Sequence, residues 1–143
     1  MFITQISVFV ENRKGTLCRI TEELGKNGID IRALSLADTT QYGILRLIVN
    51  DPDKAYETLK AADFAVSKTQ VVAVGVQDVP GGLNRVLLCL SQNDVAVEYA
   101  YAFISRESES AFVILRMDDN QKAVDVLTEA GIKIVSAGDM FDI

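Results

Sequence analysis

Two matching loops hold the residues of this sequence that are best suited to bind a small polar molecule. Residues 11–17 read ENRKGTL, and residues 77–83 read QDVPGGL. In both loops a glycine precedes a segment with helical spacing. A glycine at the start of a helix lets a ligand approach the backbone, and the N–H groups at the positive end of the helix dipole favour a carboxylate. Asp78 could accept a hydrogen bond from an ammonium group, and Asn12 could do so through its carbonyl oxygen.

A structural role explains the same residues without a ligand. Asn12 and Asp78 could cap the helices that follow them, and such a cap contributes about 1 kcal/mol. Pro80 could set a rigid helix start. Leu17 and Leu83, which follow the glycines, are expected to pack into the core. Both alternatives, the cap and the ligand contact, stay open for Asn12 and Asp78.

The composition argues against catalysis and against metal binding. The chain has no histidine, which removes histidine bases and histidine metal ligands. Cys18 and Cys89 form no CxxC motif, and we expect both to be buried in amphipathic helices of a protein in a reducing compartment. The acidic run 118–120 resembles a metal cluster, but Asp119 matches Asp51 of a helix start and is interpreted as a cap. We therefore assign no catalytic residue, metal site or cofactor.

The charge of the chain restricts its partners. With 14 basic and 20 acidic residues, the net charge is −6. An acidic chain is repelled by phosphate backbones and anionic lipid, so we expect neither nucleic acid nor membrane as a partner. No stretch approaches the roughly 20 apolar residues of a membrane span, and the first ten residues do not read as a leader. The prediction is a cytoplasmic protein.

The sequence repeats itself. A shift of 66 positions aligns the first part with the second, and further along the shift becomes 68. The second copy therefore has two extra residues, which we place in a polar hairpin tip at 105–110. The predicted copies are 1–68 and 69–143. Matching pairs include Val8 and Val74, Gly15 and Gly81, Arg19 and Arg85, Asp51 and Asp119, and Leu59 and Leu127.

Each copy has the predicted order strand, helix, strand, strand, helix, strand. This order is typical of an α+β, ferredoxin-like fold, with an antiparallel sheet of four strands and two helices on one face. The join at 67–70 has no Gly or Pro, so we expect the two tandem copies to lie side by side, and strands could run through the join. An uncovered sheet face would favour a homodimer. The predicted strands are 2–10, 29–37, 44–49, 64–67, 71–76, 95–104, 112–117 and 132–135.

The second loop, with its order strand-Asp-x-Pro-Gly-x-Leu-helix, resembles the ACT domain. That family is a small-molecule regulatory module that typically binds amino acids. The resemblance covers nearly the whole chain as two tandem ACT domains, although Asn12 and Lys14 replace the acid and the proline in the first copy. It implies a ligand held between one loop and the second strand of the opposite domain, near 29–31 or 95–97. The implied ligand residues are Asn12, Lys14, Gly15, Thr16, Leu17, Ile29, Ile31, Asp78, Pro80, Gly81, Gly82, Leu83 and Val95.

The leading hypothesis is a regulatory protein, without a catalytic domain, that senses a free amino acid at ACT-domain interfaces. It would pass a conformational or assembly change to a metabolic enzyme or regulator. Because the two loops differ in charge, we expect one of the two sites to bind more tightly. The alternatives are a ligand-free module for protein interaction or oligomerisation, and a small ferredoxin-like isomerase or lyase.

Overall fold

The computed structural model describes residues 2–38, 41–104 and 110–141, so most of the hairpin tip expected at 105–110 lies outside this part. The chain divides into two compact units. The first unit is Thr4–Thr69, and the second is Gln70–Ile143 together with Met1–Ile3. The chain passes from one unit to the other within two of its strands.

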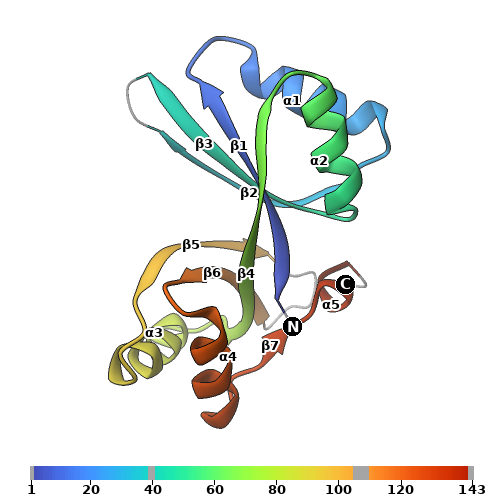
Figure 1. Ribbon diagram of the computed structural model, residues 1–143. Coiled ribbons are helices and arrows are strands. Elements are labelled where there is room, and N and C mark those ends of the chain that lie inside the picture. The colour runs from blue at the N-terminus through green and yellow to red at the C-terminus, as the bar shows by residue number, and fades with distance from the viewer. Residues whose placement is uncertain (1, 39–40, 105–109, 142–143) are drawn as a thin grey trace. The chain divides into compact units, whose positions relative to one another are not determined.

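The first unit contains a four-stranded sheet with two helices on one face (Figure 1). The strand order is β2-β3-β1-β4, and the pairs β1–β3 and β2–β3 are antiparallel. A sheet of four strands with two helices on one face is the predicted ferredoxin-like arrangement. Its elements are β1 (Ile3–Glu11), α1 (Thr16–Lys26), β2 (Ile31–Asp38), β3 (Tyr42–Val49), α2 (Pro52–Ala61) and the first part of β4 (Ala65–Gln77).

The core of the first unit lies between the sheet and its helices. Alternate residues of β1 point to this layer, as the strand period of two requires, and Ile20 and Leu24 meet them from α1 because residues four apart share a helix face. Ala55 and Leu59 complete the layer from α2. These positions confirm the periodicity of the sequence. The fully buried members are Ile6, Val8, Ile20, Leu24, Leu47, Ala55 and Leu59.

The second unit repeats the same order of elements. Its strands lie in the order β5-β6-β4-β7, which matches the first unit strand for strand. A second core cluster of Val, Leu, Ile, Met and Ala side chains fills the space between this sheet and its helices. Its elements are the rest of β4, α3 (Gly82–Gln92), β5 (Val97–Ile104), β6 (Ser110–Met117), α4 (Asn120–Glu129) and β7 (Ile134–Val135), followed by α5 (Ala137–Phe141).

Matching caps start the second helix of each unit. The side chain of Asp51 accepts a hydrogen bond from the Lys54 backbone N–H at 3.1 Å, and Pro52 occupies the first turn. The side chain of Asp119 accepts from the Lys122 backbone N–H at 3.0 Å. Both caps were predicted from the sequence, and they confirm that Asp119 belongs to a helix start.

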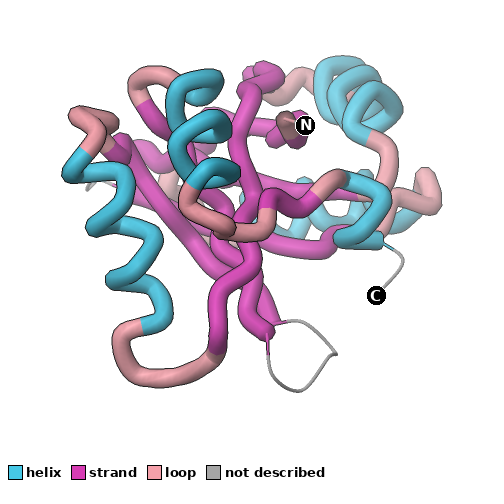
Figure 2. The backbone as a smooth tube through the Cα atoms, turned by 90° about the horizontal axis from the view of Figure 1, so that it is seen from below, coloured by secondary structure: helices cyan, strands magenta, loops and turns pink. Residues whose placement is uncertain are grey.

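At the join, the structure confirms the expectation that strands could run through it. The strands expected at 64–67 and 71–76 are one 13-residue strand, β4, so no linker separates the two copies. Short loops join helices and strands along the tube in Figure 2, and little of the described chain lies outside regular elements. None of the helices in the described part is both long and apolar enough to cross a membrane.

Candidate ligand-binding site

The two loops leave the helices after them without a side-chain cap. Gly15 and Gly81 are the N-cap residues of α1 and α3, with φ of 87° and 85°, and neither helix has a side-chain cap hydrogen bond. The capping role considered for Asn12 and Asp78 is therefore wrong. A left-handed N-cap favours glycine because other L-residues are strained there.

The first turn of α1 has free hydrogen-bond donors as a consequence. The Thr16 N–H donates to the Arg13 carbonyl at 3.3 Å, and the Arg19 N–H donates to the Gly15 carbonyl at 3.0 Å. Between them, the N–H groups of Leu17 and Cys18 have no acceptor in the part of the chain that the structure describes. These donors lie at the positive end of the helix dipole, which suits an anion.

A cavity of about 200 Å³ lies beside this loop in the first unit. Sequence reasoning anticipated four of its lining residues, while Lys14 is exposed and does not line it. The remaining residues come from the loop, from α1 and from the hairpin of β2 and β3. The anticipated residues are Asn12, Gly15, Thr16 and Leu17, and the others are Val10, Glu11, Arg13, Cys18, Leu36, Asp38 and Gly43.

Asp38 is the acidic group that sequence reasoning missed. It ends β2, its side chain is exposed, and it forms no ion pair within residues 2–38, 41–104 and 110–141. The other acid in the lining, Glu11, is neutralised by Arg13, with Oε2 and Nη2 2.6 Å apart. Asp38 is therefore the carboxylate available to a cation. The sequence offered one signal for Asp38. The matching position of the second copy is the uncharged Ile104, so the acid is specific to the first copy.

The apolar wall of the cavity corrects two expectations. Leu17 is 42% exposed and Cys18 is exposed, although both were predicted to be buried. Leu83 is likewise 43% exposed, and Cys89 is only half-buried. Ile20 is the first residue of α1 in the core, so the turn before it is free to face a ligand.

The loop of the second unit has a similar backbone conformation, with a left-handed glycine at the N-cap. It leaves less space for a side chain at the first residue of its helix. A Cβ placed on Gly82 would collide with the carbonyl oxygen of Gln77, whereas the matching Thr16 carries a side chain. Asp78 and Pro80 are exposed. The segment that corresponds to the first unit's hairpin includes residues 105–109, outside the described part.

The remaining predicted site residues lie in or against the cores. Ile29 and Val95 are 6% and 5% exposed and belong to the two core clusters, and Ile31 packs against the first of them. They do not line the 200 Å³ cavity. Among the described residues, no group of three or more Cys, Asp or Glu side chains is placed to hold a metal ion.

Comparison with known proteins places this architecture in a family. A family model described as an ACT domain pair matches residues 1–143. The chain belongs to the ACT domain family. The site loops are thus the loops after the first strand of each ACT domain.

Solved structures have a similar fold. Protein BT0572 from Bacteroides thetaiotaomicron is 40% identical, over 100% of this chain and 98% of that chain, with a TM-score of 0.94. The ligand-free regulatory subunit of aspartate kinase from Thermus thermophilus is 14% identical, over 89% of this chain and 91% of that chain, with a TM-score of 0.64. The latter likeness is one of fold. The search of curated proteins found no match.

Proposed function

We propose that this ACT domain pair is a cytoplasmic regulatory protein that binds a free amino acid in the cavity beside the first loop. One observation supports this most directly. Leu17 and Cys18, whose backbone N–H groups have no acceptor among the described residues, and Asp38, which has no ion pair among them, line the same cavity. A free amino acid carries one group for each, a carboxylate and an ammonium.

The carboxylate would bind at the start of α1. The N–H groups of Leu17 and Cys18 donate without competition from a cap, and the helix dipole adds to the attraction. Arg13 lines the same cavity and contributes positive charge, which its pair with Glu11 reduces.

The ammonium group would bind to Asp38, with the carbonyl oxygen of Asn12 as a second acceptor. Leu17 and Leu36 then offer an apolar wall to the ligand side chain. The volume of about 200 Å³ is below the roughly 300–1,000 Å³ typical of sites for larger ligands. These features favour a small amino acid with an apolar side chain.

The output of binding would be a change in assembly or conformation that a metabolic enzyme or regulator detects. Such a change requires the ligand to bind one state more tightly than the other. A second copy of the chain is the simplest partner, and a residue from that copy could complete the site.

The first experiment is a thermal-shift panel of the twenty amino acids, followed by calorimetric titration of each hit. At 100 times Kd a ligand should stabilise the protein by about 2.7 kcal/mol. Small apolar amino acids should give the largest shifts. If none of the twenty shifts the midpoint, the proposal is wrong.

A pair of variants assigns the site. Asp38→Asn should weaken binding of the hit by about tenfold or more, because the ammonium group loses its counter-charge. Glu57→Gln on α2, an exposed acid in the same unit but outside the cavity, should leave affinity unchanged. Equal affinities of the two variants would place the ligand elsewhere.

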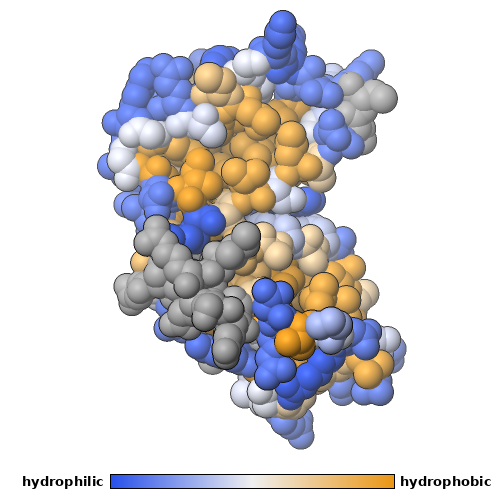
Figure 3. Space-filling view, turned by 180° about the vertical axis from the view of Figure 1, so that it is seen from behind, coloured by the Kyte–Doolittle hydropathy of each residue, from blue (hydrophilic) through white to orange (hydrophobic). Residues whose placement is uncertain are grey.

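A second candidate function, a ligand-free interaction module, is favoured by the apolar surface of the first unit. Figure 3 shows this surface in orange on the upper unit. Phe9 stacks on Tyr42 with ring centroids 5.2 Å apart, and both rings are about half exposed. Oligomerisation without any ligand response in the panel would favour this function.

A further inference from the structure

Two further cavities lie at matching places in the two repeats. In the first unit a cavity of about 360 Å³ lies between the end of β1, α1 and the turn from α2 to β4. In the second unit a cavity of about 180 Å³ lies between β4, α3 and the turn from α4 to β7. Arg19 lines the first and its repeat partner Arg85 lines the second. The two cavities can therefore be compared position by position.

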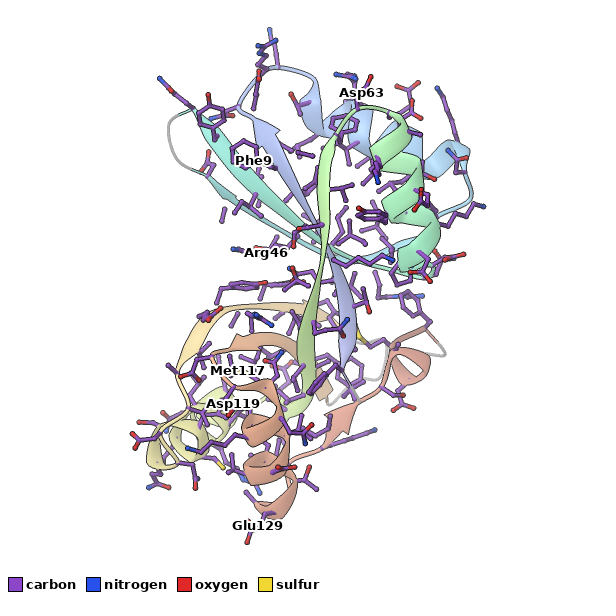
Figure 4. The ribbon with its side chains drawn as sticks, in the orientation of Figure 1. Phe9, Arg46, Asp63, Met117, Asp119 and Glu129 are labelled. Carbon is purple, nitrogen blue, oxygen red and sulfur yellow. The ribbon has the colours of Figure 1, made fainter. Side chains whose placement is uncertain are left out.

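In the first unit the charges of this cavity balance. Arg13 pairs with Glu11 at 2.6 Å, and the guanidinium of Arg19 lies 5.0 Å from the centre of the Phe64 ring. Asp63 adds a second carboxylate at the turn between α2 and β4, where Figure 4 labels it. Two cations thus face two anions.

In the second unit both carboxylates are replaced. Gln77 stands where the first repeat has Glu11, and Gly131 stands where it has Asp63. Lys133 replaces the uncharged Ala65. The cavity lining therefore contains two cations, Arg85 and Lys133, and no acid.

The two cations remain available to a ligand. Neither Arg85 nor Lys133 forms an ion pair with another described residue, although Lys133 has the carboxylate of Asp139 as a charged neighbour. One guanidinium N–H of Arg85 donates to the Ala130 carbonyl at 3.3 Å, which holds the side chain at the turn beside Gly131. The other N–H groups of this guanidinium donate to no other described residue, and a guanidinium can bind the two oxygens of one anion together.

We propose that the second-unit cavity binds a small oxyanion, a carboxylate or phosphate group of a metabolite, through Arg85 and Lys133. The site is distinct from the amino-acid cavity, because it lies in the other unit and on a loop of different sequence. The first repeat lacks this capacity, since Glu11 and Asp63 neutralise the matching place. The first unit would thus bind a zwitterion in its amino-acid cavity, and the second unit would bind an anion between Arg85 and Lys133.

The test is a titration with inorganic phosphate and, separately, with acetate, at constant ionic strength, followed by backbone amide shifts in NMR spectra. Saturable shifts at Arg85, Gly131 and Lys133 are expected. Saturation by phosphate alone identifies a phosphate group as the ligand, and saturation by acetate alone identifies a carboxylate. An absence of saturable shifts with both anions would overturn the proposal.

Charge variants distinguish anion binding in this cavity from non-specific attraction of anions to the protein. Lys133→Gln should weaken anion binding about tenfold or more, because one of the two cations is lost. Lys122→Gln on α4 removes the same charge outside the cavity and should leave the affinity unchanged. Equal weakening by the two variants would overturn the proposal as well.

A repeat-swap variant provides a second test that preserves the fold. Gly131→Asp with Gln77→Glu restores the two acids of the first repeat and should abolish the saturable shifts. The backbone accepts aspartate there, since Asp63 has φ of 67° at the place where Gly131 has 77°, and a Cβ on Gly131 would contact nothing within 4 Å. Undiminished anion binding in a variant with a wild-type melting midpoint would refute the assignment. Amino-acid binding in the first unit should be unaffected in either case.

Discussion

At the scale of single residues, Gly15 owes its identity to backbone conformation. A Cβ at Gly15 would meet no described atom within 4 Å, so neighbouring protein atoms do not require glycine there. Its φ of 87° is the reason. Cys18 and Leu17 are both exposed, although cysteine and leucine are residue types that are usually buried.

Gly15→Val should lower the free energy of unfolding by about 1–3 kcal/mol, because a β-branched residue is strained in the left-handed region. Gly25→Ala is the matched control within α1, where a Cβ also meets nothing but the backbone is helical. It should raise the free energy of unfolding by about 0.5–1 kcal/mol. Urea denaturation measures both values, and a neutral Gly15→Val would contradict the conformational argument.

Substitutions of Leu17 and Ile20, both on α1, should have different effects on ligand binding and on stability. Ile20→Ala should cost about 2–5 kcal/mol of unfolding free energy, since Ile20 is fully buried. Leu17→Ser should cost less than about 0.5 kcal/mol, as expected for a surface position, yet weaken the binding of the amino acid found in the panel. Urea denaturation and calorimetric titration measure the two effects. A large loss of stability in Leu17→Ser would place Leu17 in the core after all.

At the scale of elements, α5 is a helix that the sequence pattern did not reveal. Its five residues are too few for a periodic signal, and its start depends on a reciprocal pair. The Ser136 Oγ accepts from the Asp139 N–H, and the Asp139 carboxylate accepts from the Ser136 N–H, each at 3.2 Å. Met140 is fully buried and anchors the element.

The reciprocal hydrogen bonds of Ser136 and Asp139 predict that the stability of α5 depends on pH. The backbone N–H of Ser136, followed by its hydroxyl, holds the pKa of Asp139 below its ordinary value of 3.8. A lowered folded-state pKa means that the ionised carboxylate stabilises α5 above the ordinary value, and that this contribution is lost as the pH falls through the folded pKa. Helical Cα shifts of 137–141 should therefore decline below about pH 4.

Asp139→Asn is the control for this pH prediction. Its α5 shifts should be less helical at neutral pH and should not change over the same acid range, because the titrating group is gone. The shifts of α4 in the same spectra report any general acid unfolding. If α5 in the wild-type protein keeps its shifts to the lowest pH at which α4 stays folded, the pair does not stabilise it.

At the scale of the whole molecule, the first-unit sheet ends in an apolar edge strand. β2 is the last strand in the order of that sheet, and Leu34 on it is 57% exposed. Unprotected edge strands with exposed apolar side chains favour pairing with another chain. We therefore predict a homodimer that uses β2.

Light scattering at micromolar concentration should give the mass of a dimer, about twice 15.6 kDa. Leu34→Lys should shift this mass to that of a monomer, because a charge at the edge opposes pairing. Leu88→Lys on α3, which also replaces a half-exposed leucine, should remain dimeric. A monomeric wild-type protein would exclude the dimer.

The sequence by itself determines the order of elements and the repeat, because these follow from local chemistry. Apolar residues with periods of 2 and 3.6 define strands and helices, and Asp51 before Pro52 marks a helix start wherever the chain is placed. Gly15 and Gly81, at matching positions, likewise mark the loops of the candidate site. These features depend on neighbours within a few residues.

Tertiary structure decides which residues distant in sequence become neighbours, and with them the chemistry of each cavity. Asp38 joins the loop at residues 11–17 only because β2 ends beside it in the folded unit. Leu17 is exposed because the first turn of α1 precedes the part that packs on the sheet. Lys133 and Arg85 line one cavity although 48 positions separate them in the sequence. Such long-range proximity has no periodic signature, since packing of the cores and pairing of the strands create it.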